Sequence, residues 1–219
     1  TDGTQLSREE PSEAKEIWLF VGDSLTSGYG LTADQSYVAI LQDLINQGSW
    51  IDSERQVPPL LKNAGVSGDT SAGALRRISW LLADQPLRVF LCIGANDGMR
   101  GQPIEAMKQN IHQIIDKVKS RGAQIHLMQM YLPPNYGSEY TKSFAQSFSE
   151  VAQATSLDLF PFLLRNVAGE AKLNLNDGIH PNQAGHQLIA EQLLEHLVSA
   201  RILVKNSSTS TPLPIAPKK

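Results

Sequence analysis

The segment Ile17-Trp18-Leu19-Phe20-Val21-Gly22-Asp23-Ser24-Leu25 starts with five apolar residues and passes directly into a turn of small, polar residues. A short, uninterrupted apolar run followed by a Gly-Asp-Ser turn predicts a β-strand that is buried on both faces, as the strands of parallel sheets are. Ser24 then follows the end of this strand, and we expect its hydroxyl to be exposed at the edge of the sheet.

Further along the chain, short apolar runs alternate with apolar residues at helical spacing. Four more strands are expected at residues 60–61, 89–93, 125–130 and 157–160. Helices are expected from the apolar positions within residues 37–45, 75–82, 104–118, 140–152 and 181–197, with Asp34 and Pro181 starting the first and the last helix and Gly122 ending the third. This alternation predicts an α/β fold with a five-stranded parallel sheet covered by helices on both faces.

Composition narrows the class of protein. The chain has 219 residues, of which 41% are hydrophobic and 19% charged, and its net charge is −3. These values indicate a soluble, globular protein with one folded domain. We place this domain at residues 16–204, between a polar N-terminal tail (1–15) and a C-terminal tail (205–219) rich in Ser, Thr and Pro. The sequence has no stripe of basic residues of the kind that binds nucleic acid, and no apolar run is long enough to span a membrane.

Three glycine-rich turns follow three successive predicted strands: residues 22–24, 65–69 and 94–98. Ligands of open α/β sheets bind outside the carboxyl ends of the strands, so these turns are expected to gather at one edge of the sheet. A fourth polar motif, Asp177-Gly178-Ile179-His180-Pro181, precedes the last predicted helix. The chain is a serine hydrolase if the fold brings this motif to the same edge as Ser24.

The residue types in these motifs suit nucleophilic acyl transfer. Ser24 would be the nucleophile, His180 the base that takes its proton, and Asp177 the carboxylate that orients the imidazole. The backbone N–H of Ser24, the backbone N–H of Gly68 and the side-chain amide of Asn96 would form an oxyanion hole. Each motif alone is also an ordinary turn, but their joint occurrence at this spacing favours the functional interpretation.

Other chemistries lack their motifs. There is no Gly-x-Ser-x-Gly nucleophile elbow, no His-Glu-x-x-His metal helix and no Gly-x-Gly-x-x-Gly. Ala74 stands where a phosphate-binding loop over residues 68–73 would need Lys. Cys92 is the only cysteine, which excludes an intramolecular disulfide and a multi-cysteine metal site, and its apolar neighbours indicate a buried side chain. Asp69 and Asp97 are expected to brace loops or cap helices.

At this point the chain resembles the SGNH (GDSL) hydrolases over nearly the whole domain. The segments that carry the resemblance are Gly22-Asp23-Ser24-Leu25, residues 63–71 around Gly68, Gly94-Ala95-Asn96-Asp97 with residues 98–101, residues 132–137, and Asp177-Gly178-Ile179-His180-Pro181-Asn182. They are most similar to the bacterial arylesterase branch that includes thioesterase I/protease I/lysophospholipase L1. One departure is Ala95, where the family often has a second glycine. A methyl group is expected to be tolerated there unless the residue needs a positive φ.

The resemblance implies a flavodoxin-like three-layer α/β/α sandwich, with Ser24, Asp177 and His180 as the catalytic residues and Ser24, Gly68 and Asn96 forming the oxyanion hole. It implies hydrolysis of acyl or aryl esters, thioesters or lysophospholipids without metal or cofactor. It also implies a bacterial protein, exported to the periplasm or cytoplasmic. We expect a monomer whose partner is a small ester substrate.

Apolar residues near the motifs predict a groove for the acyl or aryl group. They are Leu25, Leu75, Ile78, Met99, Leu132, Pro133 and Ile179, about half of which would be ordinary loop packing. Two alternatives remain at this stage. A carbohydrate O-acetyl esterase would need sugar platforms, yet aromatic residues are only 6% and none is seen to cluster beside the motifs. A non-catalytic binding module would not be expected to keep Ser24, Asn96, Asp177 and His180 together.

Overall fold

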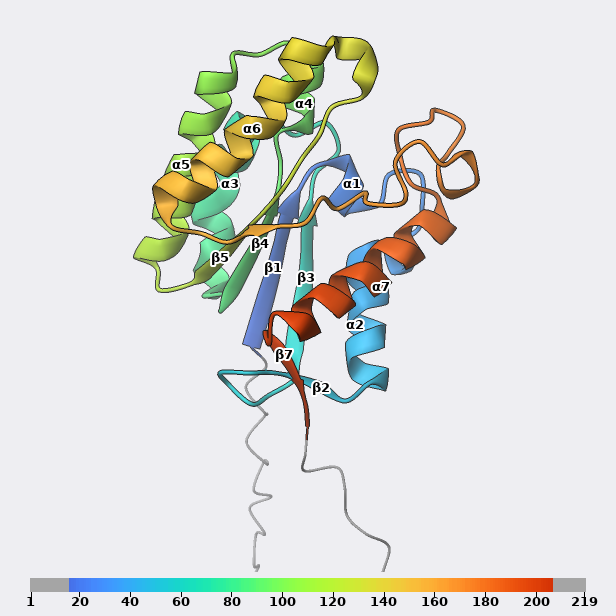
Figure 1. The fold of residues 1–219 in the computed structure, drawn as a ribbon. Coiled ribbons are helices and arrows are strands. Elements are labelled where there is room, and N and C mark those ends of the chain that lie inside the picture. The colour runs from blue at the N-terminus through green and yellow to red at the C-terminus, as the bar shows by residue number, and fades with distance from the viewer. Residues whose placement is uncertain (1–15, 207–219) are drawn as a thin grey trace, which may run out of the picture.

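The computed structural model describes residues 16–206 and has a five-stranded sheet at its centre (Figure 1). The strands lie in the order β3-β1-β4-β5-β6, and every neighbouring pair is parallel. Their bounds are β1 Glu16–Gly22, β3 Pro59–Gly65, β4 Arg88–Cys92, β5 Gln124–Met128 and β6 Leu159–Phe160. The predicted α/β fold with a five-stranded parallel sheet is therefore confirmed.

Helices cover both faces of this sheet, which gives the expected three layers (Figure 1). On one side α2 (Tyr37–Gln47) packs against α7 (Gln183–Ser199). On the other side α5 (Ile104–Ser120) packs between α3 (Ser71–Leu81) and α6 (Ser138–Thr155). The apolar residues at helical spacing in each of these segments face the sheet, and the polar residues between them face solvent. Among the described residues, none of the helices has the length and hydropathy needed to cross a bilayer.

The core forms where the central strands β1 and β4 are covered from both sides. The rings of Phe20 and Phe90 stack at 4.6 Å between centroids, and Trp18 packs on Phe90 at 5.3 Å. All three side chains are fully buried. Cys92 is buried as expected, and burial raises the pKa of its thiol well above the usual range. This rigid centre holds the carboxyl ends of β1 and β4, from which the chain continues into the turns described below.

Two helices begin two residues after the predicted positions. The first turn of α2 is capped by Ser36, whose hydroxyl accepts from the backbone N–H of Ala39, whereas Asp34 lies in a preceding 3₁₀ helix. The last helix is capped by Asn182, whose side chain accepts from the N–H of Gly185, so Pro181 lies just outside it. In both places a serine or asparagine side chain next to the expected cap satisfies the free N–H groups of the first turn.

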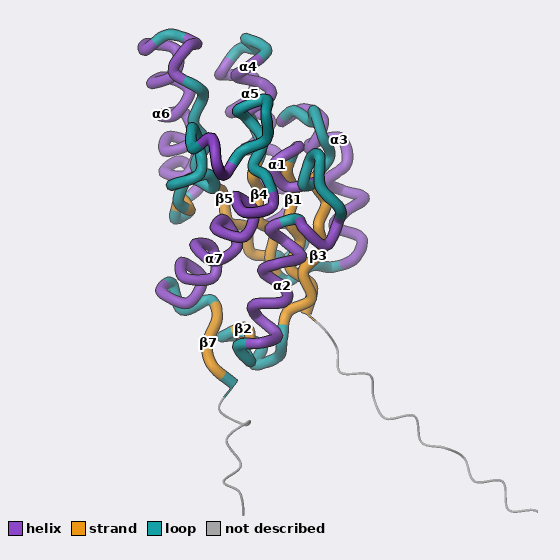
Figure 2. Tube along the Cα trace, turned by 90° about the vertical axis from the view of Figure 1, so that its right-hand side faces the viewer, coloured by secondary structure: helices purple, strands orange, loops and turns teal. Residues whose placement is uncertain are grey.

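A small antiparallel sheet of β2 (Trp50–Asp52) and β7 (Leu203–Lys205) was not predicted. Figure 2 shows it at the lower end of the molecule, away from α1 (Ser24–Ser27). It is anchored to the main sheet by a buried ion pair in which Arg88 Nε lies 2.7 Å from Asp52 Oδ2. Three-residue strands carry too little periodicity to be seen in a sequence. β7 ends at Lys205, the first residue of the proposed C-terminal tail (205–219). The proposed N-terminal tail (1–15) and residues 207–219 lie outside the described residues.

The remaining elements are short and lie mainly in the connections. They are the helices α1 (Ser24–Ser27) and α4 (Ala95–Met99) and the 3₁₀ helices η1 (Ala33–Gln35), η2 (Leu82–Asp84), η3 (Pro134–Tyr136) and η4 (Ala171–Leu173). The chain leaves β1 toward β3 on one side of the sheet and returns to β4 on the other. The ends of β1 and β4 thus flank the topological switch point, where open α/β sheets bind ligands.

Candidate active site

Ser24 is the first residue of α1, directly beyond the end of β1. The side chain of Asp23 caps this helix by accepting from the N–H of Leu25 at 3.0 Å. Gly22 is required by close packing, since a Cβ there would lie 2.1 Å from Thr26 Oγ1 and 2.8 Å from the carbonyl oxygen of Cys92. The tight strand-to-helix turn therefore holds the Ser24 hydroxyl at the edge of the sheet, as expected from the sequence.

A loop before α7 carries Asp177 and His180. The Asp177 carboxylate accepts from the backbone N–H groups of Ile179 (2.9 Å) and His180 (3.0 Å) through Oδ1, and its Oδ2 lies 2.7 Å from Nδ1 of the His180 ring. These hydrogen bonds, the backbone bond from His180 foremost, lower the pKa of Asp177 to about 2. One carboxylate thus shapes the turn and orients the imidazole, and it stays ionised at neutral pH.

The fold brings the two distant motifs together. Nε2 of His180 lies 2.9 Å from Oγ of Ser24, across 156 positions of sequence. The loop with His180 is held by backbone bonds from Leu175 N to His180 O (2.7 Å) and from Gly178 N to Leu175 O (2.9 Å). Ser24, His180 and Asp177 form a continuous hydrogen-bonded chain from hydroxyl to imidazole to carboxylate, which is the arrangement that lets a base accept the hydroxyl proton.

Gly68 and Asn96 come from the turns after β3 and β4. Gly68 has a φ of +79°, and its carbonyl accepts from Nη2 of Arg100 at 2.9 Å. Asn96 donates through Nδ2 to the carbonyl of Asp69 at 2.9 Å, and the same nitrogen lies 3.4 Å from Oδ2 of Asp23. Among residues 16–206, the backbone N–H groups of Ser24 and Gly68 have no hydrogen-bond partner. Two backbone N–H groups are thus without a partner, while both N–H groups of the Asn96 amide have acceptors, Asp69 O and, at the longer distance, Asp23 Oδ2.

The carboxylates of Asp69 and Asp97 brace these turns, as predicted. Asp97 accepts from the N–H (2.8 Å) and hydroxyl (2.6 Å) of Ser71, which ties α4 to the start of α3. Asp69 pairs with Nε of Arg77 at 2.8 Å. Ala95 is the first residue of α4 and has no positive φ, so its methyl group is accommodated where the family often has glycine.

Asp23 is a buried carboxylate that forms no salt bridge within residues 16–206. Its side chain is only 1% exposed, and burial, partly offset by the bond from Leu25 N, raises its pKa to about 6. Among its titratable neighbours, His180 lowers the pKa of Asp23 and Asp69 raises it. No role for Asp23 can be predicted from the sequence, because only burial distinguishes this residue from an ordinary helix cap.

An apolar pocket of about 380 Å³ opens beside Ser24. Five of the predicted groove residues line it: Leu25, Met99, Leu132, Pro133 and Ile179. The other two do not line it: Ile78 is fully buried in the core, and Leu75 packs against the core, because both lie on the side of α3 that faces the sheet. Residues that the sequence analysis missed also line the pocket, among them Met130, Tyr131, Phe162 and Leu164. They follow β5 and β6, so the rule about carboxyl ends of strands would have found them.

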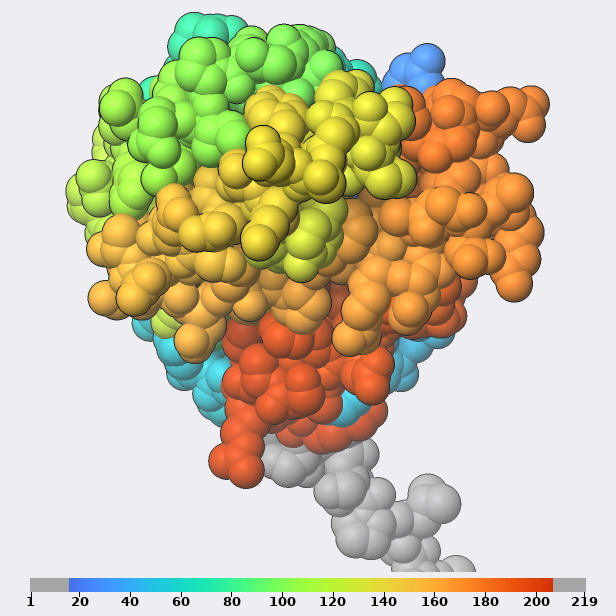
Figure 3. Space-filling view, turned by 45° about the horizontal axis from the view of Figure 1, so that its top comes forward, coloured from blue at the N-terminus to red at the C-terminus, as the bar shows by residue number. Residues whose placement is uncertain are grey.

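Two segments that line the apolar pocket lie side by side on the surface in Figure 3: residues around 131–136, in yellow, and residues around 162–180, in orange. Aromatic side chains gather here, contrary to the sequence analysis. Tyr131 and Tyr29 are each 50% exposed, and Tyr29 packs on the ring of His180 at 4.4 Å between centroids. Tyr29 lies only five residues beyond Ser24, but its contact with His180 depends on the fold.

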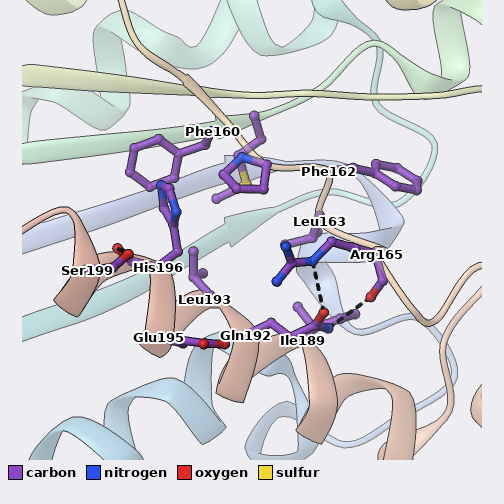
Figure 4. Close-up of a pocket in the computed structure, with 12 residues that line it drawn as sticks. Phe160, Phe162, Leu163, Arg165, Ile189, Gln192, Leu193, Glu195, His196 and Ser199 are labelled. Atoms are coloured by element: carbon purple, nitrogen blue, oxygen red, sulfur yellow. Dashed lines mark hydrogen bonds between the residues drawn. The ribbon is translucent and has the colours of Figure 1, made fainter.

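A second cavity of about 200 Å³ lies between α7 and the segment after β6 (Figure 4). Its wall includes Arg165, whose Nε donates to Oε1 of Gln192 at 3.3 Å and whose backbone carbonyl accepts from Nε2 of Gln192 at 2.9 Å. Ser199 and His196 also line it, but the Ser199 hydroxyl donates to the backbone carbonyl of His196 at 2.9 Å. This cavity therefore lacks the serine–imidazole hydrogen bond found at Ser24. Among the described residues, no cluster of His, Cys, Asp and Glu side chains is arranged to hold a metal ion.

Comparisons with known proteins show which proteins the chain is similar to. The chain is 33% identical over 188 residues to an arylesterase of Vibrio mimicus, which covers 85% of this chain and 90% of that protein. It is 35% identical over 185 residues to thioesterase 1/protease 1/lysophospholipase L1 of Escherichia coli K12, covering 84% of each. The crystal structure of the psychrotrophic esterase EstA from Pseudoalteromonas sp., inhibited by monoethylphosphonate, superimposes with a TM-score of 0.78 at 35% identity and covers 85% of this chain and 98% of EstA.

The sequence model of the GDSL-like lipase/acylhydrolase family matches residues 20–188, which include Ser24, Gly68, Asn96, Asp177 and His180. Because this match spans most of the chain and is joined by bacterial relatives at about 35% identity, the chain belongs to the GDSL-like lipase/acylhydrolase family.

Proposed function

We propose that the protein is a serine esterase that hydrolyses carboxylic esters through an acyl-enzyme on Ser24. The observation that carries the proposal is the hydrogen-bonded chain from Ser24 Oγ to His180 Nε2 (2.9 Å) and from His180 Nδ1 to Asp177 Oδ2 (2.7 Å). These distances are within the range over which a proton is transferred between a nucleophile and its base.

The reaction takes two steps in this site. In the first, Ser24 gives its proton to Nε2 of His180 while Oγ bonds to the carbonyl carbon. The bond to the leaving oxygen then breaks, and that oxygen takes the proton from Nε2 and departs as an alcohol. In the second, a water molecule gives a proton to Nε2 and attacks the acyl carbon, the bond to Oγ breaks, and Oγ regains the proton as the acid leaves. Asp177 stabilises the imidazolium formed in each step.

The negative charge on the carbonyl oxygen would be held by three donors: the N–H groups of Ser24 and Gly68 and the amide of Asn96. The two backbone groups have no partner among the described residues, so no hydrogen bond must break before they bind the oxygen. The Asn96 amide donates one N–H to the carbonyl of Asp69 at 2.9 Å, and its second N–H, in a longer bond of 3.4 Å to Asp23, would have to turn from that carboxylate to the carbonyl oxygen of the substrate. Removing one such donor typically costs about 10²–10³ in rate.

The apolar pocket beside Ser24 is proposed to take the acyl group. Its lining by Leu25, Met99, Leu132 and other apolar side chains favours an acyl chain, since each buried methylene contributes about 0.8 kcal/mol. Its volume of about 380 Å³ limits that chain to a short to medium length. Thioesters and lysophospholipids present the same acyl carbon, and the name of the Escherichia coli relative includes both activities. We propose them as further substrates of this site.

The test combines covalent labelling with a chain-length series. A fluorophosphonate should label the wild-type protein at Ser24 and should not label Ser24→Ala. Wild-type protein should hydrolyse p-nitrophenyl esters with a preference among acyl lengths from two to sixteen carbons, and Ser24→Ala should lose this activity while its circular dichroism spectrum is unchanged. Labelling without hydrolysis of any ester or thioester would contradict the esterase proposal, and activity retained in Ser24→Ala would place the nucleophile elsewhere.

A carbohydrate O-acetyl esterase is the second candidate, because the half-exposed rings of Tyr29 and Tyr131 stand beside the site where a sugar could stack. Acetylated xylose and cellobiose are therefore included in the substrate series. A kcat/KM for these sugars above that for every simple acyl ester would favour the second candidate.

Two further properties are proposed with this function. The named relatives are bacterial proteins, and we propose an exported or periplasmic location, which fractionation of a bacterium producing the complete gene product would test. We also propose a monomer, which gives a mass near 24.0 kDa by light scattering.

A further inference from the structure

Tyr29 covers one side of the His180 ring. The centroids of the two rings are 4.4 Å apart, and their planes are inclined by 36°. Half of the Tyr29 side chain nevertheless remains exposed, at 50% of its accessible surface. The blue atoms of the segment after β1 stand beside the orange loop segment in Figure 3. An aromatic surface is thus presented to solvent directly next to the imidazole.

The backbone around Tyr29 holds the ring in this place. Gly28 and Gly30 flank it with φ values of +76° and +78°, which favour glycine at both positions. The N–H of Tyr29 donates to the carbonyl of Ser24 at 3.1 Å, and a Cβ on Gly30 would lie 2.8 Å from Cδ1 of Leu175. The turn is therefore tied to the helix that carries the nucleophile and packed on the loop that carries His180.

Tyr29 stands outside the acyl pocket. Ser24 lines that pocket, whereas neither Tyr29 nor His180 does. When the acyl chain occupies the pocket and the carbonyl carbon is at Ser24 Oγ, the leaving oxygen must lie within hydrogen-bonding distance of His180 Nε2 to receive its proton. Whatever is attached to that oxygen extends past the imidazole, where the exposed part of the Tyr29 ring lies.

We infer that Tyr29 is a specificity-determining residue that binds the leaving group of the ester and selects aromatic leaving groups. This inference rests on the proposed esterase function and assigns the side of the substrate opposite to the acyl chain. An aromatic ring on the leaving group packs offset or edge-on against Tyr29, at the 4.5–7 Å typical of such pairs. An aromatic pair of this kind contributes about a three- to tenfold preference.

The experiment compares two esters of the same acid. Benzyl butanoate and methyl butanoate place the same acyl chain in the pocket, but only benzyl alcohol is large enough to contact Tyr29. The ratio of their kcat/KM values is measured for wild type, Tyr29→Ala and Tyr29→Phe. The ratio removes any effect of Tyr29 on His180 itself, because such an effect changes both esters equally. Trp80→Ala is the matched control, since Trp80 is 77% exposed but stands on α3, about 13 Å along the helix from Ser71.

In Tyr29→Ala the benzyl-to-methyl ratio should fall about three- to tenfold, while Tyr29→Phe and Trp80→Ala should keep the wild-type ratio. An equal loss on both esters in Tyr29→Ala would overturn the inference, because it would show that the ring only holds His180 in place. Wild-type protein that hydrolyses neither ester would refute the esterase function and this inference together. Active wild type with an unchanged ratio in Tyr29→Ala would refute the inference alone.

Discussion

Replacing Asp23 by Asn should make the protein more stable at alkaline pH. The Asp23 side chain is 1% exposed and forms no salt bridge with any other described residue, and burial raises its pKa from 3.8 to about 6. The folded state therefore binds this proton more tightly than the unfolded chain does, and stability decreases as the pH rises from 3.8 to 6. Above pH 6 the ionised carboxylate costs the folded state about 3 kcal/mol, because one pKa unit corresponds to about 1.4 kcal/mol.

Asparagine removes this cost but introduces a smaller one. Its side-chain oxygen keeps the cap on the N–H of Leu25, so its NH₂ group must face Nδ2 of Asn96, which is 3.4 Å from Asp23 Oδ2 in the wild type. Two donors facing each other cost about 1 kcal/mol. The net gain for Asp23→Asn is then about 2 kcal/mol at pH 8, and near zero at pH 4, where the wild-type carboxyl is already protonated in the folded state.

Urea unfolding at pH 8 and pH 4 measures the free energy of unfolding of both proteins at each pH. Tryptophan fluorescence follows the transition, because Trp18 is fully buried and becomes exposed on unfolding. Asp97→Asn is the matched control. Asp97 is equally buried, but its two oxygens accept from the N–H and hydroxyl of Ser71, and an amide has only one acceptor oxygen. This control should lose about 1–3 kcal/mol at pH 8. The reasoning is refuted if Asp23→Asn is no more stable than wild type at pH 8, or if its gain is as large at pH 4.

Three further predictions concern the proposed catalytic chain, the acyl pocket and acid stability. Asp177→Asn should lower kcat by about 10³–10⁴-fold with little change in KM, since the amide no longer fixes the required tautomer of the neighbouring imidazole; a loss below tenfold in steady-state assays would contradict this role. Leu132→Trp fills part of the 380 Å³ pocket and should move the preferred p-nitrophenyl ester to a shorter acyl chain, whereas an unchanged chain-length profile would show that the acyl group binds elsewhere. The buried ring of His186 accepts from the N–H of Tyr37 at 3.0 Å, and burial lowers its pKa from 6.5 to about 4. The contribution of the neutral ring to the free energy of unfolding is therefore complete above pH 6.5, and about 3 kcal/mol of it is lost as the pH falls toward 4. Urea unfolding should show a smaller loss between pH 7 and pH 4.5 in His186→Gln than in wild type, and an identical loss would count against this cause.

Much of the architecture could be predicted from local pattern. The run from Ile17 to Val21 is apolar throughout because β1 is covered on both faces, and the helical stripes of α2, α3, α5, α6 and α7 face the sheet that they cover. Predicted helix starts were wrong where two nearby side chains could each cap the helix, as when Ser36 rather than Asp34 caps α2. Errors also arose where an element is too short to show a period, as for β2 and β7.

The candidate site shows the same division. The residue types of the site and the order of its motifs could be read from the sequence. A nucleophile and a base must be particular side chains, and the donors to the anion lie in glycine-rich turns that follow strands. Leu75 and Ile78 were also expected near the groove, but both belong to the apolar stripe by which α3 packs on the sheet, and Ile78 is buried in the core.

The sequence by itself determined the strand–helix order and the chemistry available at the strand ends, since both follow from the side chains and their spacing. Only the tertiary structure decided that His180 lies 2.9 Å from Ser24 across 156 positions, that Asp23 is a buried carboxylate without a salt bridge in the described part of the chain, and that Tyr29 covers the imidazole. The physical reason is that distance, desolvation and ring contact depend on what packs against a residue. At this edge of the sheet those neighbours come from remote parts of the chain.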